Sequence, residues 1–386
     1  MDSINFISIN KKDNSSFFSN KNYKRYFIKI YFLSLFFLYL SFIFFIFNLK
    51  NYKFIRNKKI YFDNKTFIKN KTTEEYMKNL DKINIINYNQ NILQVYKEKQ
   101  NNFCENPDKY YNHQWEDLIG LTNFSFKNIS YQIYVYKKYD NYMSKGIIRS
   151  GQYESKHMSN FLEALKYYSK VNKITNNKDI FILDIGGNIG TYPSFLAKFG
   201  YSILTFEASP RNYYILNKNY CHINKGSNIF IINKGISNIE KKCNYFSQID
   251  GIGNGILLCD EKKNLIKIAG FYFNKTYEVT LTKLSSFLPY LSNKNIAIIK
   301  LDIEGGEGKA IEGGIELIIK YHVPYIFSEY NPNMLKRHGT NPIKFLQLFI
   351  NNGYKISLKG FLSKSYVSID KVKNAGNLYF IYNGIQ

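Results

Sequence analysis

The chain has 386 residues, of which 45% are apolar, so it can bury a sizeable core and is not disordered throughout. Its 7 Pro and the lack of a Gly-X-Y period exclude a collagen-like or proline-rich polymer. The 4 Cys include no C-x-x-C pair, which argues against a disulfide-dense scaffold and against structural zinc. The formal net charge of +24 first suggests a nucleic acid or an anionic membrane as partner.

The positive charge is concentrated near the N-terminus. Within residues 1–72, Lys and Arg exceed Asp and Glu by 11, and the remaining excess is spread over the rest of the chain. Lys, Asn, Ile, Tyr and Phe are abundant throughout, a bias typical of codon drift toward A and T. Because the sequence carries no RNA-recognition sheet motif, zinc-finger spacing or Arg-rich helix, we expect most of this charge to be solvated surface and no nucleic-acid partner.

A transmembrane anchor is predicted near the N-terminus. Residues 1–29 form a polar, basic tail, and residues 30–49 then run for twenty positions without a charge. A helix of that length is about 30 Å long, the thickness of the hydrocarbon layer. No small-residue cleavage site follows, so we expect an uncleaved anchor rather than a signal peptide, with a buried core helix as the alternative. Both flanks are basic, so the charge rule does not fix the orientation.

We expect the tail to be cytoplasmic and the large domain to face the lumen of the endoplasmic reticulum or Golgi. Residues 50–100 are polar and poorly periodic, which indicates a stem or linker. Asn-x-Ser/Thr sequons suit a glycosylated lumenal domain, although an Asn-rich chain also produces them by chance. The five sequons after the anchor begin at Asn64, Asn70, Asn123, Asn128 and Asn274.

Ordered structure is predicted to begin near Trp115, in an N-terminal flank over 101–178 that contains a strand-like segment at 123–136 and a helix at 159–168. From Ile180 onward, apolar strands alternate with helices, which predicts an α/β domain over 179–386 with a doubly wound, mostly parallel sheet. The strand-length runs are at 180–183, 203–206, 229–232, 296–301 and 325–327. The helical stretches are near 191–199, 210–222, 284–291, 306–320 and 342–351. The final segments YKISL and NLYFIY are expected to pair as a hairpin.

The strongest local signal is FILDIGGNIGTYPSFLAKFG at 181–200. A strand ends at Asp184, a turn with three glycines follows, and a helix opens near Thr191. Glycines let a ligand lie directly against the backbone. Glu207 ends the next strand, where a carboxylate suits the two hydroxyls of a ribose. Asp184 is placed to accept from an ammonium group or a water. These residues predict a nucleoside crevice, although a glycine turn alone can be purely structural; the loop residues are Gly186, Gly187, Asn188 and Gly190.

A second acidic motif, IIKLDIEGGEGKAIEGG, spans 298–314. A buried strand delivers Asp302 and Glu304 at its carboxyl end, and Glu307 follows as a helix begins. These carboxylates are expected to face the same crevice as the glycine loop. The alternatives are helix capping for Glu307 and a turn role for Asp302.

Taken together, these motifs resemble those of the FkbM-type methyltransferases, a branch of the class I S-adenosylmethionine-dependent fold. The likeness covers roughly 146–358. The chain departs from the family at Leu284-Ser285, where many members have a Leu-Asp pair. The matching residues are Leu183, Asp184, Gly186, Asn188 and Gly190, then Phe206 to Pro210, then Lys300, Asp302, Glu304, Gly305 and Glu307, with Glu329 and Gly151 to Glu154 as weaker matches.

The resemblance implies methyl transfer from S-adenosylmethionine to a hydroxyl of a sugar or a polyketide-like molecule. Asp184 and the loop from Gly186 to Thr191 would hold the methionine end, and Glu207 the ribose. A sugar hydroxyl needs a base or a divalent ion, for which Asp302 and Glu304 are candidates and Glu307 the third. Their oxygens would suit Mg²⁺ rather than zinc.

The interpretation of the whole chain is a membrane-anchored O-methyltransferase that acts on a glycan or glycoconjugate. Its rivals are an RNA methyltransferase facing the cytoplasm and an inactive FkbM-like binding module. The five His lack partner spacing and are taken as surface or packing residues. Cys221 is expected to be a small buried hydrophobe, whereas Cys243 and Cys259 are equally compatible with a disulfide and with free thiols.

Overall fold

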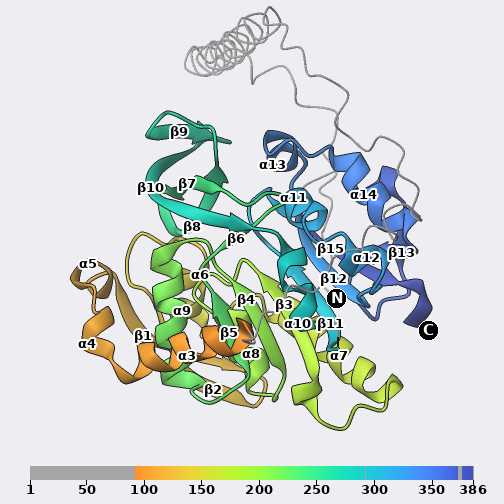
Figure 1. Cartoon of the computed structure of the whole chain (residues 1–386), viewed down its shortest axis with the longest axis horizontal. Helices are drawn as coiled ribbons and strands as arrows, with labels where there is room; N and C mark the ends of the chain where they lie inside the picture. Colours follow the sequence, from red (N-terminus) through yellow and green to blue (C-terminus); the bar gives the residue numbers. More distant parts are fainter. Residues whose placement is uncertain (1–91, 292, 373–375, 386) are drawn as a thin grey trace, which may run out of the picture. The chain divides into compact units, whose positions relative to one another are not determined.

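The structure of the chain is a computed structural model that describes residues 92–291, 293–372 and 376–385 (Figure 1). They belong to one compact unit, Asn87–Gln386. The predicted tail, the predicted anchor at 30–49 and most of the predicted stem lie outside the described residues. Within the described ranges, no helix combines the length and apolarity that crossing a membrane requires.

An eight-stranded sheet forms the centre of the unit, in the order β14-β13-β15-β12-β11-β3-β4-β5. β12, β11, β3, β4 and β5 are parallel, and β15 pairs antiparallel with both β12 and β13. The predicted mostly parallel sheet and the predicted terminal pair are therefore both present. The strands are β3 (Ile180–Ile185), β4 (Ser202–Phe206), β5 (Ile229–Ile232), β11 (Asn295–Leu301), β12 (Tyr325–Tyr330), β13 (Tyr354–Ser357), β14 (Tyr366–Val367) and β15 (Gly376–Tyr382).

Helices cover both faces of this sheet, which is why its central strands are apolar without alternation. Every residue of β3 is buried. On one face, alternate residues of β3 pack with α7 (Ser155–Val171), α8 (Thr191–Ala197) and α9 (Pro210–Ile223). The other face packs against a second group of short helices and turns. That group consists of η2 (Leu284–Phe287), α10 (Leu288–Leu291), α11 (Glu307–Glu312), α12 (Glu316–Ile319), α13 (Pro332–Arg337) and α14 (Pro342–Asn351).

A second sheet is inserted between β5 and β11, in the order β6-β10-β7-β8, with β9 paired to β10 (Figure 1). The strand-length runs predicted from the sequence include none of these five strands, and the glycine-rich segment between Cys243 and Cys259 forms most of strand β8. Because glycine is depleted in strands, the repeated glycines of GIGNGILL argued against a strand in the sequence. The strands are β6 (Gly235–Ile236), β7 (Lys242–Gln248), β8 (Gly251–Leu258), β9 (Leu265–Ile268) and β10 (Phe271–Thr282).

The segment before β3 forms a flank of helices and one hairpin. The predicted strand at 123–136 is two strands joined by a turn, and the predicted helix at 159–168 lies within α7. Helix α3 begins at Ile92, so the last part of the predicted linker is helical and order starts before Trp115. The flank comprises α3 (Ile92–Glu105), α4 (Pro107–Tyr110), α5 (His113–Glu116), β1 (Ile119–Phe126), β2 (Ile129–Tyr136), α6 (Met143–Ser150), α7 and η1 (Asn177–Asp179).

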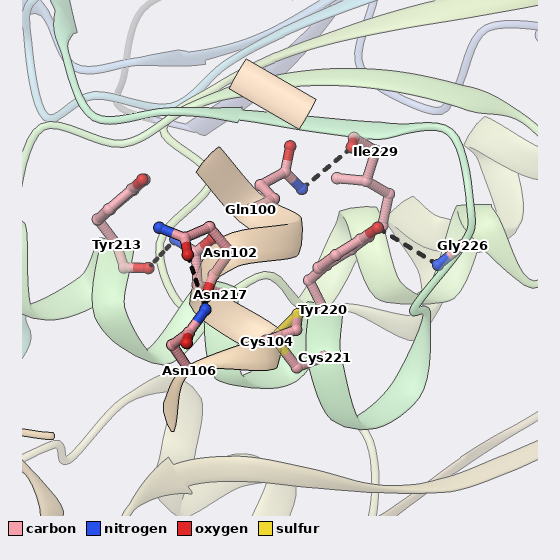
Figure 2. The surroundings of a disulfide bond; sticks show 10 residues. All are labelled: Gln100, Asn102, Cys104, Asn106, Tyr213, Asn217, Tyr220, Cys221, Gly226 and Ile229. Atoms are coloured by element: carbon pink, nitrogen blue, oxygen red, sulfur yellow. Dashed lines mark hydrogen bonds between the residues drawn. A yellow bond between two sulfur atoms is a disulfide. The ribbon is translucent and has the colours of Figure 1, made fainter. Parts of the chain in front are cut away.

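Helix α3 seals the β5 edge of the central sheet (Figure 2). Gln100 is fully buried; its amide nitrogen donates to the Ile229 carbonyl at 3.1 Å, and its amide oxygen accepts from the Ile231 N–H at 3.1 Å. One side chain thus supplies the two bonds that a further strand would make. A disulfide between Cys104 of α3 and Cys221 of α9 fixes the helix in place.

All four cysteines are paired in the structure. The expectation that Cys221 is an unpaired hydrophobe is wrong, because its partner Cys104 is 117 residues away and gave no local signal. Cys243 and Cys259 also form a disulfide, which is one of the two alternatives that the sequence left open. This second disulfide joins β7 to the segment that follows β8.

Candidate functional site

The candidate site lies at the carboxyl ends of the parallel strands. From β3 the chain proceeds to β4 and β5 on one side, and β11 and β12 lie on the other. Ligands bind at such a switch point in open α/β sheets. A cavity of about 740 Å³ opens here, within the size range of small-molecule sites. Its walls come from the loop after β3, the ends of β4, β11 and β12, and the inserted sheet.

The glycine loop after β3 presents bare backbone to this cavity. Gly186 has φ +93°, and a Cβ there would lie 2.0 Å from the Asp302 carbonyl oxygen. At Gly187 a Cβ would lie 2.2 Å from the Thr205 hydroxyl. Neither position can therefore carry a side chain without displacing its neighbours. Asn188 and Thr191 also line the cavity, whereas Gly190 does not and instead caps α8 in the left-handed conformation.

Asp184 is buried beneath this loop and faces an internal ammonium group. Its Oδ2 accepts from the Thr205 hydroxyl at 2.9 Å, and its Oδ1 lies 3.4 Å from Lys300 Nζ without another hydrogen-bond partner. Burial raises the pKa of Asp184, and Lys300 opposes that rise. The predicted ammonium partner is thus supplied by the chain itself, and Oδ1 is buried with Lys300 as its nearest cation.

Lys300 connects the glycine loop to the acidic motif. Its ammonium lies 3.2 Å from Asp302 Oδ2 and donates to the Gly186 carbonyl at 3.2 Å. Burial would lower the pKa of Lys300, but the negative charges of Asp302, Asp184 and Glu154 outweigh burial and raise it. Lys300 therefore stays charged and holds two carboxylates and the loop in one arrangement.

Glu207 at the end of β4 is 6% exposed and lines the cavity. Its Oε2 accepts from the Asn188 N–H at 2.7 Å, and its Oε1 accepts from the Ser209 N–H at 2.8 Å. Burial raises the pKa of Glu207 to about 7, against these two stabilising bonds. Because a carboxylate has about four acceptor positions, each oxygen can still accept from a ligand hydroxyl.

Four more carboxyl groups line the cavity, on Glu154, Asp302, Glu304 and Glu329. Burial and the charge of Asp302 raise the pKa of Glu304 to about 8. Burial and the charge of Glu304 raise that of Glu329 to about 9, and its Oε2 has no hydrogen-bond partner. Burial also raises the pKa of Glu154, which accepts from the Tyr192 hydroxyl at 2.7 Å. Glu304 and Glu329 can therefore accept or release protons near neutral pH.

Glu307 does not line the cavity. Its Oε1 accepts from the N–H groups of Ile303 and Gly305, at 3.0 and 3.2 Å, and so closes the turn that leads into α11. Burial and the charge of Glu329 raise its pKa to about 8. The expectation that Glu307 faces the crevice is therefore wrong; it stabilises the turn before α11, although it does not cap that helix as the alternative had it. Asp302 and Glu304 both line the cavity, as expected.

Metal binding gains no support from the part of the chain that the structure describes. Within it, no three or more His, Cys, Asp and Glu side chains are grouped so that they could hold a metal ion. Ser285, at the position where many family members have Asp, lies in the turn η2 and does not line the cavity. The residue that departs from the family motif therefore lies outside the cavity lining.

Several cavity residues were not assigned a role from the sequence. Lys300 could have been noticed in the sequence because it is the only charged residue in an apolar strand. Glu154 could have been noticed because it ends the segment before the glycine loop that weakly matches the family motif. Tyr245 of β7 and Asn377 of β15 gave no local signal, because they enter the cavity only through the arrangement of their strands. His157, taken as a packing residue, interacts through Nε2 with the Asn377 side-chain amide at 3.2 Å.

The fold and this cavity define a nucleoside-binding α/β domain of the kind found in class I methyltransferases. The glycine loop leaves bare backbone, Glu207 has free acceptor positions, and Asp184 Oδ1 is buried beside the loop. These features fit the ribose and the charged tail of S-adenosylmethionine. Residues 184–356 match the family described as the methyltransferase FkbM domain. The resemblance drawn from the sequence motifs is thereby confirmed, and this segment is an FkbM-type methyltransferase domain.

Individual relatives are more distant. "Methyltransferase 1" of Beauveria bassiana (strain ARSEF 2860) is 29% identical over 146 residues, which cover 35% of this chain and 58% of that protein. The chain thus spans little more than half the length of this relative. Among solved structures, M. jannaschii TYW2 in complex with AdoMet aligns with a TM-score of 0.28 and 12% identity, covering 68% of this chain and 84% of that one. An O-methyltransferase from Bacillus cereus in complex with SAH aligns with a TM-score of 0.28 and 13% identity over 58% of this chain and 90% of its own.

Proposed function

We propose that this protein is an S-adenosylmethionine-dependent O-methyltransferase that modifies a hydroxyl of a glycan or glycoconjugate. One observation carries the proposal. The bare glycine loop, the Glu207 carboxylate and a cluster of carboxyl groups line the same 740 Å³ cavity. The loop and Glu207 suit a nucleoside cofactor, and the carboxyl cluster suits an acceptor that donates hydrogen bonds.

The cofactor would be held by Asp184, the Gly186–Thr191 loop and Glu207. When bound, S-adenosylmethionine supplies a methyl group that is open to attack by an oxygen nucleophile. The chain contributes mainly binding and orientation, which can supply about 7–11 kcal/mol toward such a two-reactant step. Lys300 fixes Asp184 and Asp302 relative to the loop, so the carboxylate of Asp302 keeps a defined position beside the cofactor loop.

The carboxyl cluster would orient the acceptor hydroxyl and take up its proton. Asp302 is ion-paired with Lys300 at 3.2 Å, which orients its carboxyl group as a hydrogen-bond acceptor. Glu304, whose pKa is raised to about 8, is better matched to proton uptake at neutral to mildly alkaline pH.

Two features support a lumenal location for the domain. Both disulfides would persist in an oxidising compartment and be reduced in the cytosol. The three sequons within the described residues, at Asn123, Asn128 and Asn274, are all exposed and accessible to glycosylation. With the predicted anchor at 30–49, these features favour a single-pass protein of the endoplasmic reticulum or Golgi. Digestion of the expressed protein with an N-glycosidase should increase its gel mobility; unchanged mobility would contradict the lumenal orientation.

The direct test of the proposed reaction is labelling. The full chain in detergent is incubated with radiolabelled S-adenosylmethionine and with extracts fractionated into glycans, lipids, proteins and RNA. We expect label in the glycan or glycoconjugate fraction. Label confined to RNA would favour the cytoplasmic rival, and binding of the cofactor without label in any fraction would favour an inactive module.

A further inference from the structure

Beyond the carboxyl cluster, the cavity reaches strand β15 at Asn377. In the antiparallel pairing of β12 with β15, Asn377 lies directly opposite Glu329, which also lines the cavity. Side chains that are directly opposite in such a pair lie on the same face as close neighbours. Strands β12 and β11 separate β15 from β3, a distance of about 14 Å across three strand spacings. Asn377 therefore belongs to the carboxyl side of the cavity and not to the glycine loop.

The amide of Asn377 has one end held by the protein and the other end open. Its Nδ2 lies 3.2 Å from His157 Nε2, and among the described residues none donates a hydrogen bond to its Oδ1. This oxygen is not one of the described buried atoms that lack a partner, so solvent or a ligand can reach it. An amide oxygen can only accept. The open end of Asn377 therefore suits a hydrogen-bond donor in the cavity.

His157 of α7 fixes the orientation of this amide. Its Nδ1 contacts the Tyr379 hydroxyl on the same strand as Asn377, so both ring nitrogens are engaged. Burial and the neighbouring Lys156 lower the pKa of His157, whereas Asp302 opposes them, and the imidazole is neutral at pH 7. Because the amide nitrogen can only donate, Nε2 accepts and the ring proton lies on Nδ1. This tautomer keeps the nitrogen of Asn377 toward the ring and leaves the oxygen free.

We propose that Asn377 is an acceptor-binding residue, whose amide oxygen accepts a hydrogen bond from a second hydroxyl of the acceptor, and that His157 positions it. A sugar carries hydroxyl groups on neighbouring carbons, so one can bind Asn377 while another lies at the carboxyl cluster. An acceptor with a single hydroxyl offers no second donor, so the subsite selects polyhydroxylated molecules. This inference rests on the proposed function, because it assumes that a hydroxyl-bearing acceptor enters the cavity.

Steady-state methylation by the full chain in detergent tests the subsite. The probe is a dilution series of the glycan or glycoconjugate fraction that takes up label, with radiolabelled S-adenosylmethionine in excess. Asn377→Ala should raise KM for this fraction about fivefold to tenfold with kcat within about threefold, because the lost bond holds the acceptor before and during the reaction. Affinity for S-adenosylhomocysteine should be unchanged in calorimetry. The matched control is His322→Leu, which removes a ring stacked on Tyr382 of the same strand, outside the cavity lining, and should leave KM unchanged.

A pair of variants separates positioning by His157 from simple packing. His157→Leu removes the nitrogen that orients the amide and should raise KM about threefold or more. His157→Gln supplies a side-chain oxygen that can accept from Asn377 Nδ2, so KM should return to within about twofold of the unchanged protein. The His157 ring also lies 5.2 Å from the Phe327 ring, in apolar surroundings. If His157 only packed there, Leu would be tolerated better than Gln, which is the opposite order.

The outcomes distinguish this inference from the proposed function. If the unchanged protein labels the fraction and Asn377→Ala has an unaltered KM, the subsite is wrong and the proposed function stands. If the unchanged protein labels no glycan or glycoconjugate fraction, the proposed function fails and the inference fails with it. Should Asn377→Ala lose binding of S-adenosylhomocysteine through misfolding, the two His157 variants decide the question. KM must then rise in His157→Leu and recover in His157→Gln, and equal values in both would overturn the inference.

Discussion

The two disulfides lie in two different regions of the molecule, and these regions differ in their relation to the cavity. Cys104–Cys221 joins α3 to α9 at the sheet edge, where Gln100 completes the hydrogen bonding of β5. Cys243–Cys259 lies in the inserted sheet, and Cys259 itself lines the cavity. Cys104, Cys221 and Gln100 lie outside the cavity lining, although Asn212 at the start of α9 belongs to it, and the inserted sheet forms part of the cavity wall. Changes in the edge region should therefore alter stability alone, and changes in the cavity region should alter binding or turnover.

The largest expected effect belongs to the cavity region. Asp302→Asn removes a carboxylate that belongs to the carboxyl cluster of the cavity and is ion-paired with Lys300. Methyl transfer to the labelled acceptor fraction should fall at least about 100-fold, whereas affinity for S-adenosylhomocysteine should stay near normal. Asp250→Asn, in an exposed turn outside the cavity lining, is the control. Retained turnover in Asp302→Asn would remove this residue from the catalytic assignment.

At the edge, replacing both Cys104 and Cys221 with Ser should lower the free energy of unfolding by about 4–5 kcal/mol, because that disulfide closes a long loop. Denaturant titration measures the change, and calorimetry with S-adenosylhomocysteine should show unaltered affinity in the folded protein. If the double variant also bound S-adenosylhomocysteine more weakly, the claim that the edge region affects stability alone would be wrong.

In the cavity wall, replacing Cys243 and Cys259 with Ser opens a loop with a sequence separation of only 16. The expected loss of stability is smaller, about 3 kcal/mol. Unlike the edge variant, this one should also bind S-adenosylhomocysteine several-fold more weakly, since Cys259 itself lines the cavity. The two double variants serve as controls for each other in the same titrations. Equal affinity in both would show that the inserted sheet does not shape the site.

The last prediction is a pH dependence of stability that comes from buried carboxyl groups in and beside the cavity. Burial raises the pKa values of Glu207, Glu304, Glu307 and Glu329 to about 7, 8, 8 and 9. The unfolded chain titrates its Glu residues near pH 4.3. Their contribution to stability is therefore fully present below about pH 4.3 and is lost as pH rises through 7 to 9. The Tm should fall over this range, and Glu329→Gln should flatten the decline; an unchanged slope would contradict the assigned pKa.

The sequence predicted the central sheet and the motif residues because each signal is local. Apolar runs of strand length mark β3, β4, β5, β11 and β12, and the glycine loop lies directly beside its acidic partners. The inserted sheet was missed because the glycines with which β8 lines the cavity also hide its strand character. Gln100, Tyr245 and the Cys104–Cys221 pair depend on contacts between distant segments, which no local pattern encodes.

The account depends most on Glu207 binding the ribose of a nucleoside cofactor. Calorimetry can compare S-adenosylhomocysteine with its 2′,3′-dideoxy analogue in the unchanged protein, in Glu207→Ala and in Glu278→Ala, an exposed control on β10. We predict that Glu207→Ala binds S-adenosylhomocysteine more than about tenfold more weakly, and that it no longer distinguishes the two ligands. Unaltered affinity in Glu207→Ala, or full discrimination against the dideoxy analogue, would contradict the central claim.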